Sequence, residues 1–416
     1  MKRKKFFCVK LIAILCLLLI FLTGCGKVET TNNESNEENK GTEVNQETNE
    51  NVQTKSVSSK GGSFVKYEGY TYYWKLTANS RSKTALFANY TETLNTKNDL
   101  VKMDENGNKE TVLTDKGSGE IFISDNKMFL SYAEDEYNSK RKIYSVNMKG
   151  ENKVEYQDGI MKYIVGDYII CQTQNDGDIF RINTKTDEIQ TLKENANILG
   201  CVDGIIYYAE ANTSSTGILK IGFLKGTEDS RIVATFSKSE FENYAESAPI
   251  EVTEFWSEND KIKMYIGYRA GTANVLQEQY LLTMDKDGKN IKKETSNYDE
   301  AISEEEQKTE GVYFKTIQQN GEYISNLMYV DEETKERKEF MTESEINEKF
   351  GFTSDDEHTT SLYTSNIDGK DIFVVLDYGE HYSEEDIGWR YSYKRLKTVA
   401  FKYNIDTNEV TEIYSF

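Results

Sequence analysis

Two short acidic segments, residues 132–137 and 377–391, carry most of the side chains in this chain that could bind a ligand. Both mix carboxylates with large aromatic rings, a combination that can stack on sugars or hold a peptide. The alternative is that both are solvated loops whose rings pack on neighbouring elements. The ligand-binding candidates are Tyr132, Glu134, Tyr137, Glu380, His381, Tyr382, Trp389 and Arg390.

The same segments allow a catalytic alternative. Glu380 and Glu384, with His381 between them, could supply the acid and base of glycan hydrolysis, which uses paired carboxylates. The chain has only two histidines, however, and it lacks the nucleophile-elbow, metalloprotease, phosphate-loop and dinucleotide-binding patterns. A binding role is therefore favoured, an enzyme acting on glycan or peptide is the alternative, and we assign no catalytic residue and no cofactor.

Acidic turns that resemble the start of a calcium loop begin at Asp104 and Asp285. A full calcium loop needs a further carboxylate at its twelfth position, and from Asp285 that position is Ser296. Asn147 and Asn183 occupy equivalent places further along the chain. Because Asn and Asp both favour tight turns, turn formation explains the whole set, and we predict no metal site.

The first 24 residues have the pattern of an export signal. They contain five basic residues and no acidic one, and every residue from Leu11 to Leu22 is apolar. This apolar run is shorter than the roughly 18 to 20 residues of a spanning helix. The sequence Leu22-Thr23-Gly24-Cys25 resembles the lipobox of bacterial lipoproteins, in which the cysteine is diacylated and the preceding peptide is removed.

The lipobox resemblance implies a signal peptide at residues 1–24 and a lipid on Cys25. The alternatives are a retained N-terminal anchor or an ordinary signal peptide. Two acyl chains are sufficient for stable attachment, whereas one binds only marginally. The expected location is therefore the extracytoplasmic face of the cell membrane, with the protein held by its lipid.

The charge of the chain excludes one class of partner. Its 416 residues include 71 acidic and 50 basic side chains, which give a net charge of −21. Removing residues 1–24 also removes five positive charges and takes the net charge to −26. Nucleic-acid binding depends on clustered Lys and Arg, so we expect no nucleic-acid partner. The expected partners are the membrane, through the lipid, and a protein or cell-wall ligand.

Residues 25–60 follow the lipobox and contain no aromatic residue. Such a segment cannot bury enough apolar surface to offset the entropy of ordering, so we expect a lipidated cysteine followed by a disordered spacer. A flexible coil of this length reaches on the order of 30 to 35 Å. Further along the chain, Cys171 and Cys201 sit in apolar runs and are read as buried thiols rather than a disulfide.

The rest of the chain, residues 61–416, repeats a two-part pattern. Each unit starts with a hairpin whose second strand is rich in Tyr, Phe and Ile, and continues with an aliphatic strand, an Asn or Asp turn and a short strand. The first halves begin near Phe64, Ile121, Tyr163, Gly200, Phe255, Gly311 and Leu362. The second halves begin at Leu100, Ile143, Ile179, Leu219, Leu281, Leu327 and Phe401.

Seven four-stranded antiparallel units at such spacing predict an all-β fold, a single β-propeller. Seven blades are preferred, and six or eight are also compatible. Residues 342–351 have a capping-box start and predict one short helix between blades, and residues 237–248 have a similar pattern. In a propeller, the loops that join second and third strands share one face with the connections between blades. The two acidic segments could therefore border one pocket.

The repeats also resemble the YWTD-like propellers found in a domain of unknown function on Gram-positive lipoproteins. The phrases that carry the resemblance are Tyr70-Thr71-Tyr72-Tyr73-Trp74 and Gly204-Ile205-Ile206-Tyr207-Tyr208. The chain contains no true Tyr-Trp-Thr-Asp tetrapeptide. The resemblance implies a fold and a location but no reaction. The function expected from these observations is a membrane-tethered binding or scaffolding module for a protein, peptide or cell-wall ligand.

Overall fold

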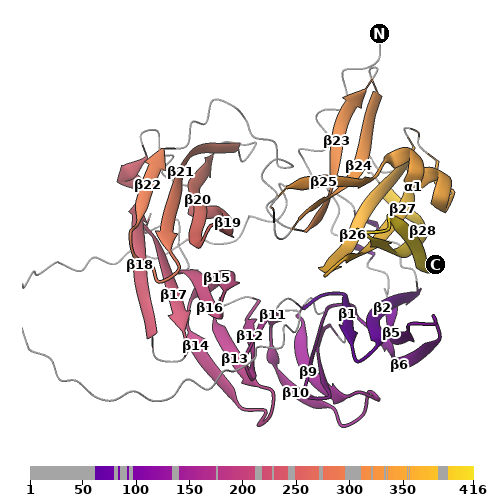
Figure 1. The fold of residues 1–416 in the computed structure, drawn as a ribbon, viewed down its shortest axis with the longest axis horizontal. Helices are drawn as coiled ribbons and strands as arrows, with labels where there is room; N and C mark the ends of the chain where they lie inside the picture. Colours follow the sequence, from indigo (N-terminus) through magenta and orange to yellow (C-terminus); the bar gives the residue numbers. More distant parts are fainter. Residues whose placement is uncertain are drawn as a thin grey trace, which may run out of the picture. The chain divides into compact units, whose positions relative to one another are not determined.

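Strand pairing in the computed structural model gives seven antiparallel sheets of three or four strands, each built from a continuous stretch of chain (Figure 1), and one separate two-stranded pair. The alternating apolar residues form these strands because every second side chain faces a neighbouring sheet. The structure describes residues 61–78, 83–84, 91–92, 97–133, 140–174, 177–210, 218–226, 229–241, 249–270, 275–295, 311–319, 322–331, 334, 336–353, 355, 357–382 and 392–416.

The first four sheets follow one another along the chain, and each has four strands. The first sheet contains β1 (Phe64–Tyr67), β2 (Tyr70–Ala78), β5 (Lys97–Asp104) and β6 (Lys109–Lys116). The second contains β7 (Glu120–Ser124), β8 (Lys127–Tyr132), β9 (Lys142–Asn147) and β10 (Val154–Asp158). The third contains β11 (Ile160–Val165), β12 (Tyr168–Gln172), β13 (Ile179–Asn183) and β14 (Ile189–Lys193). The fourth contains β15 (Ala196–Val202), β16 (Ile205–Glu210), β17 (Ile218–Lys225) and β18 (Asp229–Ser237).

The last three sheets complete the series. The fifth contains β19 (Ile250–Glu258), β20 (Lys261–Ala270), β21 (Val275–Asp285) and β22 (Lys292–Thr295). The sixth has three strands among the described residues, β23 (Val312–Gln319), β24 (Glu322–Val330) and β25 (Arg337–Met341). The seventh contains β26 (His358–Asp368), β27 (Asp371–Tyr382), β28 (Ser392–Asn404) and β29 (Glu409–Ser415). The predicted seven-bladed propeller of antiparallel blades is confirmed.

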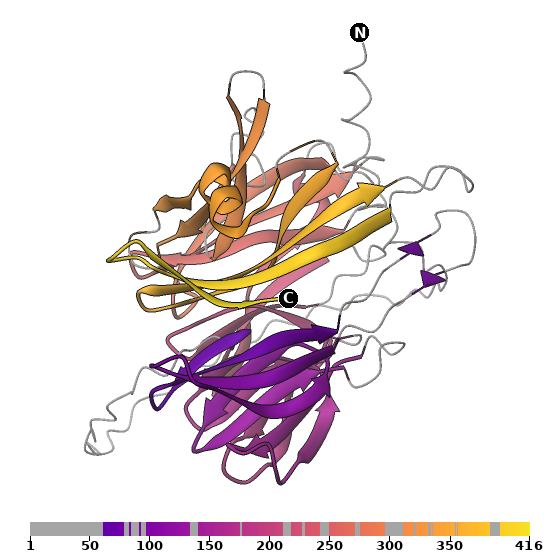
Figure 2. The same cartoon turned by 90° about the vertical axis from the view of Figure 1, so that its right-hand side faces the viewer.

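The first and last sheets lie side by side and close the ring. β1 contacts both β7 and β26, and the indigo and yellow strands are neighbours in Figures 1 and 2. Each of these two sheets uses strands from one end of the chain only, so side chains rather than a shared sheet join them. The rings of Phe64 and Phe373 stack with centroids 5.0 Å apart. Lys66 forms an ion pair with Asp371, and the Asn366 side-chain amide donates to the Phe64 carbonyl at 2.8 Å.

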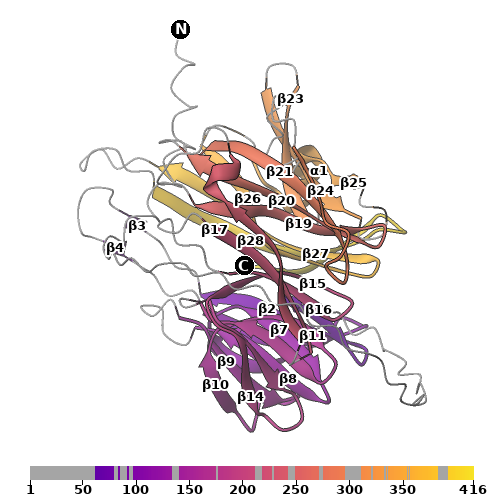
Figure 3. The same cartoon turned by 90° about the vertical axis from the view of Figure 1, so that its left-hand side faces the viewer.

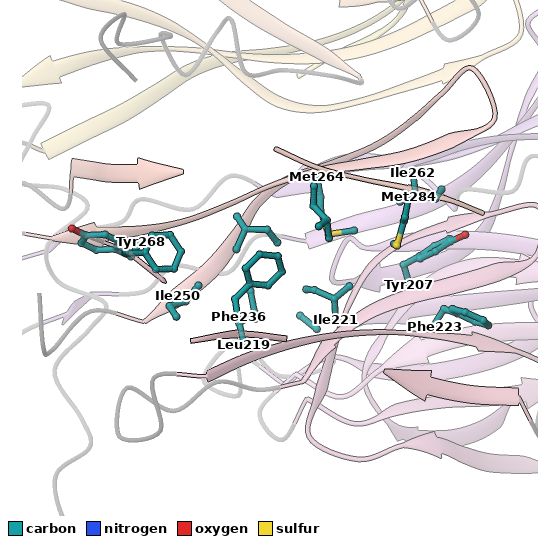
Figure 4. Close-up of a cluster of buried hydrophobic side chains, with 14 residues drawn as sticks. Tyr207, Leu219, Ile221, Phe223, Phe236, Ile250, Ile262, Met264, Tyr268 and Met284 are labelled. Carbon is teal, nitrogen blue, oxygen red and sulfur yellow. The ribbon is translucent and has the colours of Figure 1, made fainter. Parts of the chain in front are cut away.

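Buried apolar side chains fill the spaces between neighbouring sheets. Six clusters each draw residues from two successive sheets. Figure 4 shows the cluster between the fourth and fifth sheets, whose labelled members are Tyr207, Leu219, Ile221, Phe223, Phe236, Ile250, Ile262, Met264, Tyr268 and Met284. Apolar packing between sheets therefore runs from the sixth sheet through the seventh and the first to the fifth, and among the described residues no such cluster joins the fifth sheet to the sixth.

The turns use the Asn, Asp and Gly residues that the sequence places there. Asp125 and Asn126 both have positive φ in the β7–β8 turn, a conformation that Asn and Asp adopt more readily than most residues. In the β5–β6 turn, the Asp104 carboxylate accepts a hydrogen bond from the Asn108 backbone N–H at 2.8 Å. Asp285 likewise accepts from the Asn290 side chain at 2.6 Å. These acids therefore have the turn-forming role predicted for them.

In the part of the chain that the structure describes, helical structure lies in connections between sheets. The helix α1 (Glu343–Phe350) begins at the predicted capping box, where the Thr342 hydroxyl accepts from the Glu345 N–H at 3.2 Å. In the second predicted segment, only Lys238–Glu240 is described as helical, a single 3-10 turn. Residues 242–248 lie outside the described part of the chain. Among the described residues, no helix has the length and apolar character needed to cross a membrane.

Both described cysteines are free thiols, as predicted. Cys171 is fully buried in the cluster between the second and third sheets. Burial raises the pKa of its thiol well above the usual value. Cys201 is partly buried, and its pKa is raised to about 11, mainly by desolvation. Both thiols are therefore protonated at neutral pH, and a protonated thiol is a poor nucleophile.

Candidate functional site

Strand direction separates the propeller into two faces. Turns between first and second strands, and between third and fourth strands, lie at one end of each sheet, which we call the turn face. Loops between second and third strands, and the connections from one sheet to the next, lie at the other end, which we call the loop face. The β2–β5 connection on the loop face contains the short pair β3 (Lys83–Thr84) and β4 (Thr91–Glu92) (Figure 3).

Both acidic segments singled out from the sequence follow a second strand and so start on the loop face. Tyr132 ends β8 and is only 1% exposed. Its ring meets the Trp74 ring edge-on at 5.8 Å and stacks on the Tyr144 ring at 4.7 Å. Tyr132 thus supports Trp74 from within the core. Glu134 and Tyr137 lie outside the described residues.

The second acidic segment is shorter as a loop than the sequence suggested. β27 continues through Glu380, His381 and Tyr382, and its backbone pairs with β28 as far as Tyr382 opposite Ser392. Earlier in the strand, Asp377 is buried and bonded, accepting from the Thr398 hydroxyl at 2.6 Å and pairing with Arg395. Trp389 and Arg390 lie outside the described residues. The ligand contacts proposed for Glu380, His381, Tyr382, Trp389 and Arg390 stay predictions.

A cavity of about 380 Å³ opens on the loop face where the first, second and seventh sheets meet. We call it the loop-face cavity. Its volume lies toward the small end of the range typical of small-molecule pockets, roughly 300 to 1,000 Å³. The polar and aromatic residues that define it are Ser63, Trp74, Asn98, Glu120, Arg141 and Tyr363.

Close backbone approach positions this lining. The connection into β7 passes so near β8 that a Cβ on Gly119 would lie 1.5 Å from the Ser131 carbonyl oxygen. Only glycine fits there, and the following residue, Glu120, reaches the cavity as the first residue of β7. Similarly, a Cβ on Gly61 would lie 1.8 Å from the Phe122 ring. The chain before β1 is therefore held against the second sheet.

Three buried polar atoms of the lining residues have no hydrogen-bond partner among the described residues. They are Trp74 Nε1, Asn98 Nδ2 and Glu120 Oε2. Trp74 is 4% exposed and Asn98 2% exposed. Buried polar groups are almost always bonded in folded proteins, and leaving one unbonded costs about 1 to 3 kcal/mol. Three such atoms on residues that line one cavity therefore indicate a site that a bound molecule would complete.

The charge of Glu120 is balanced within the site. Its Oε1 accepts from Arg141 at 2.8 Å, while its Oε2 is the unpartnered oxygen. Arg141 is fixed by its backbone, whose N–H donates to the Gln174 side chain at 2.6 Å and whose carbonyl accepts from Gly159 at 2.9 Å. The pair therefore offers a ligand one acceptor oxygen at a position that the surrounding strands hold in place.

Tyr363 supplies the aromatic rim of the loop-face cavity. The pairing of β26 with β27 shifts register between Leu362 and Thr364, so Tyr363 is the extra residue of a β-bulge. Bulges redirect side chains and are common beside functional sites. The side chain is 44% exposed, its hydroxyl lies 3.1 Å from the Ser118 hydroxyl, and the Arg395 guanidinium lies 5.5 Å from its ring centre. These contacts hold an exposed ring in a defined orientation.

Tyr414 forms part of the wall of the same cavity. Its hydroxyl donates to the Trp74 carbonyl at 3.4 Å. Burial raises the pKa of Tyr414 above its usual value. The group therefore stays neutral at physiological pH and adds no charge to the site.

A larger cavity of about 750 Å³ lies on the turn face between the first and seventh sheets. Several of its charged groups are bonded to one another or to the backbone. Lys66 pairs with Asp371, and Lys109 donates to the Ile413 carbonyl at 2.6 Å. No atom of its lining is among the unpartnered buried side-chain atoms of the described residues. The loop-face cavity is therefore the stronger candidate for a ligand site.

The residues of the loop-face cavity were not singled out from the sequence. Trp74 was noted only as part of a tyrosine-rich hairpin, and Asn98, Glu120, Arg141 and Tyr363 were not singled out. Glycines on either side of Ser118, immediately before Glu120, were a detectable signal of close backbone approach. Within the described part of the chain, no group of three or more His, Cys, Asp or Glu side chains is placed to hold a metal ion.

Comparisons with known proteins give the fold alone. No family model matches the chain, and no curated protein matches its sequence. The propeller domain of the Trilobed protease from Pyrococcus furiosus is 11% identical, with 86% of this chain and 98% of that chain covered and a TM-score of 0.41. A puromycin-hydrolysing peptidase from Mycobacterium tuberculosis is 8% identical, with 86% and 53% covered and a TM-score of 0.42. A chain of a nidogen/laminin complex is 8% identical, with 84% and 93% covered and a TM-score of 0.28.

Proposed function

We propose that this protein is a lipid-anchored binding module on the extracytoplasmic face of the membrane, and that its loop-face cavity binds the ligand. The lipobox-like sequence ending at Cys25 supports the anchor, and the polar segment at residues 25–60 supports a spacer that holds the propeller away from the lipid. The observation that carries the binding role is the set of three unpartnered buried polar atoms on residues lining one cavity.

The lining residues favour binding over the catalytic alternative. Among the described residues that line the loop-face cavity, Glu120 is the one carboxylate, and none is a histidine or a cysteine. Hydrolysis of a glycosidic bond generally uses two carboxylates on opposite sides of the bond. Propeller folds occur in peptidases and lyases as well as in binding proteins. The fold itself therefore does not decide between the two functions, and the residues of the site support a binding role.

The proposal is tested by sedimentation of the mature lipoprotein, kept in detergent, with purified cell walls from the same cells. We expect it to co-sediment with the cell walls, and we expect the double variant Trp74→Phe with Asn98→Leu to bind at least tenfold more weakly, since it removes both unpartnered donors. The matched control is Lys149→Ala, an exposed residue of the β9–β10 turn on the turn face. Equal retention of the double variant and the wild type would contradict a role for the loop-face cavity.

A further inference from the structure

The hydrogen-bonding groups of the loop-face cavity restrict the chemistry of a ligand. An indole N–H and an amide NH₂ can only donate, and an ionised carboxylate can only accept. To satisfy Trp74 Nε1, Asn98 Nδ2 and Glu120 Oε2 together, a bound molecule must accept at least twice and donate at least once. A group of neighbouring hydroxyls does both, because each hydroxyl donates one hydrogen bond and accepts two.

The electrostatics of the cavity favour an uncharged ligand. The Glu120 carboxylate is already paired with Arg141 at 2.8 Å, so it offers a cation little uncompensated charge. An anion would meet the free oxygen of Glu120 and the field of a chain with a net charge of −21. A neutral molecule escapes both penalties and still bonds to all three unpartnered atoms.

Backbone pairing near the cavity argues against a peptide added as a further strand. Peptides that bind by strand addition use the free N–H and C=O groups of a sheet edge. Here the edge of β7 is occupied, since the Ile121 N–H donates to the Gly62 carbonyl at 3.0 Å. The Phe64 carbonyl of β1 accepts from the Asn366 side chain at 2.8 Å. Both edges beside the cavity are therefore already bonded at these positions.

The exposed ring of Tyr363 completes the pattern. An aromatic face packs well against the C–H face of a pyranose ring, while the hydroxyls at the edge of the sugar reach polar groups beside it. Tyr363 is 44% exposed and held by the contacts with Ser118 and Arg395. Together with Trp74, it gives the site an aromatic element next to its donors and its acceptor.

We propose that the loop-face cavity binds one unit of a neutral saccharide. This inference rests on the proposed binding function and names the class of its ligand. The sugar ring lies against Tyr363. Its hydroxyls accept from Trp74 Nε1 and Asn98 Nδ2 and donate to Glu120 Oε2. The Arg141 side chain holds the Glu120 carboxylate in place.

The test is isothermal titration of the intact mature protein with a defined panel of probes. The panel holds glucose, galactose and N-acetylglucosamine with their β-linked disaccharides, glucuronate as an anionic sugar, and a capped trialanine peptide. We expect at least one neutral saccharide to bind with Kd below about 10 mM, a range in which single sites of this size are measurable. We expect Asn98→Leu, Glu120→Gln and Tyr363→Ala each to weaken that binding at least tenfold.

Several controls keep the outcomes distinct. Lys149→Ala on the turn face should bind like the wild type, and thermal unfolding of each variant shows whether it is folded. Tyr363→Ala alters only an exposed side chain, so it remains informative if a buried variant fails to fold. Binding of glucuronate or the peptide instead of neutral sugars, with the same sensitivity to the variants, would overturn the saccharide class while leaving the binding site in place. If no probe binds and the cell-wall sedimentation is also unaffected by the variants, both proposals fail.

Discussion

Replacing Asn98 by leucine should stabilise the unliganded protein while it weakens ligand binding. The Asn98 side chain is 2% exposed, and its Nδ2 has no partner among the described residues. It lies opposite Leu76 across the β2–β5 pair, so leucine would have an apolar neighbour on the same face of the sheet. Removing an unbonded buried donor should recover about 1 to 3 kcal/mol of unfolding free energy.

The size of the effect on melting follows from the size of the protein. Unfolding entropy is about 2.1 cal/mol/K per residue, which gives about 0.7 kcal/mol/K for the roughly 350 residues of the propeller. A gain of about 1 to 3 kcal/mol therefore corresponds to a rise of roughly 1.5 to 4 °C in Tm. Scanning calorimetry of the apo protein measures this difference directly.

A second buried asparagine provides the matched control. Asn326 in β24 is 6% exposed, but its amide donates to Glu339 at 2.7 Å and its carbonyl oxygen accepts from the Glu343 N–H at 3.0 Å. Asn326→Leu breaks both bonds and should lower Tm, in contrast to Asn98→Leu. Equal destabilisation by the two substitutions would refute the reasoning, because it would show that the Asn98 amide is satisfied in the free protein.

Four further predictions concern the anchor, the spacer and the closure of the ring. Cys25→Ala should release the protein from membranes or block its maturation, because the acyl chains are the expected anchor; mass spectrometry that finds an unmodified, uncleaved N-terminus would contradict this. Deleting residues 30–58 should leave the Tm of the propeller unchanged, since the segment has no aromatic residue and only three valines to bury; a fall of more than a few degrees would show that it belongs to the fold. Phe373→Ala, in the cluster that joins the seventh and first sheets, should cost about 3 to 5 kcal/mol, whereas Lys149→Ala should change stability by less than about 0.5 kcal/mol; similar losses in urea unfolding would contradict the packing. Burial raises the pKa of Asp371, but bonds from its lysine and asparagine partners outweigh burial and lower the pKa overall. The contribution of Asp371 to stability is therefore present above the unfolded pKa of about 3.9 and is lost as the pH falls toward the lowered folded pKa. Asp371→Asn should reduce the loss of stability between pH 5 and 3 in urea unfolding, and an unchanged loss over this pH range would contradict this.

The fold could be predicted because its information is local. Alternating apolar residues and turn residues such as Asn126 and Gly204, both with positive φ, recur in every unit, and each sheet is built from one continuous stretch of chain. The helix at residues 343–350 was predictable for the same reason, since its capping box lies within four residues.

The candidate site could not be predicted because its residues come together only in the tertiary structure. Trp74, Glu120 and Tyr363 belong to three different sheets. The position of Tyr363 depends on a β-bulge, and a bulge leaves no clear trace in a strand of alternating residues. The sequence also placed a loop at residues 377–391, where β27 in fact extends to Tyr382. That extension pairs with residues 392–395 of the neighbouring strand β28, a contact that forms only in the folded sheet.

The measurement that tests the binding site most directly is a crystal structure of the mature protein soaked with the tightest-binding saccharide of the panel. We predict ligand density in the loop-face cavity, with sugar oxygens within hydrogen-bonding distance of Trp74 Nε1, Asn98 Nδ2 and Glu120 Oε2, and with the sugar ring packed on Tyr363. Density for water alone in this cavity, with the saccharide bound elsewhere on the propeller, would contradict the account.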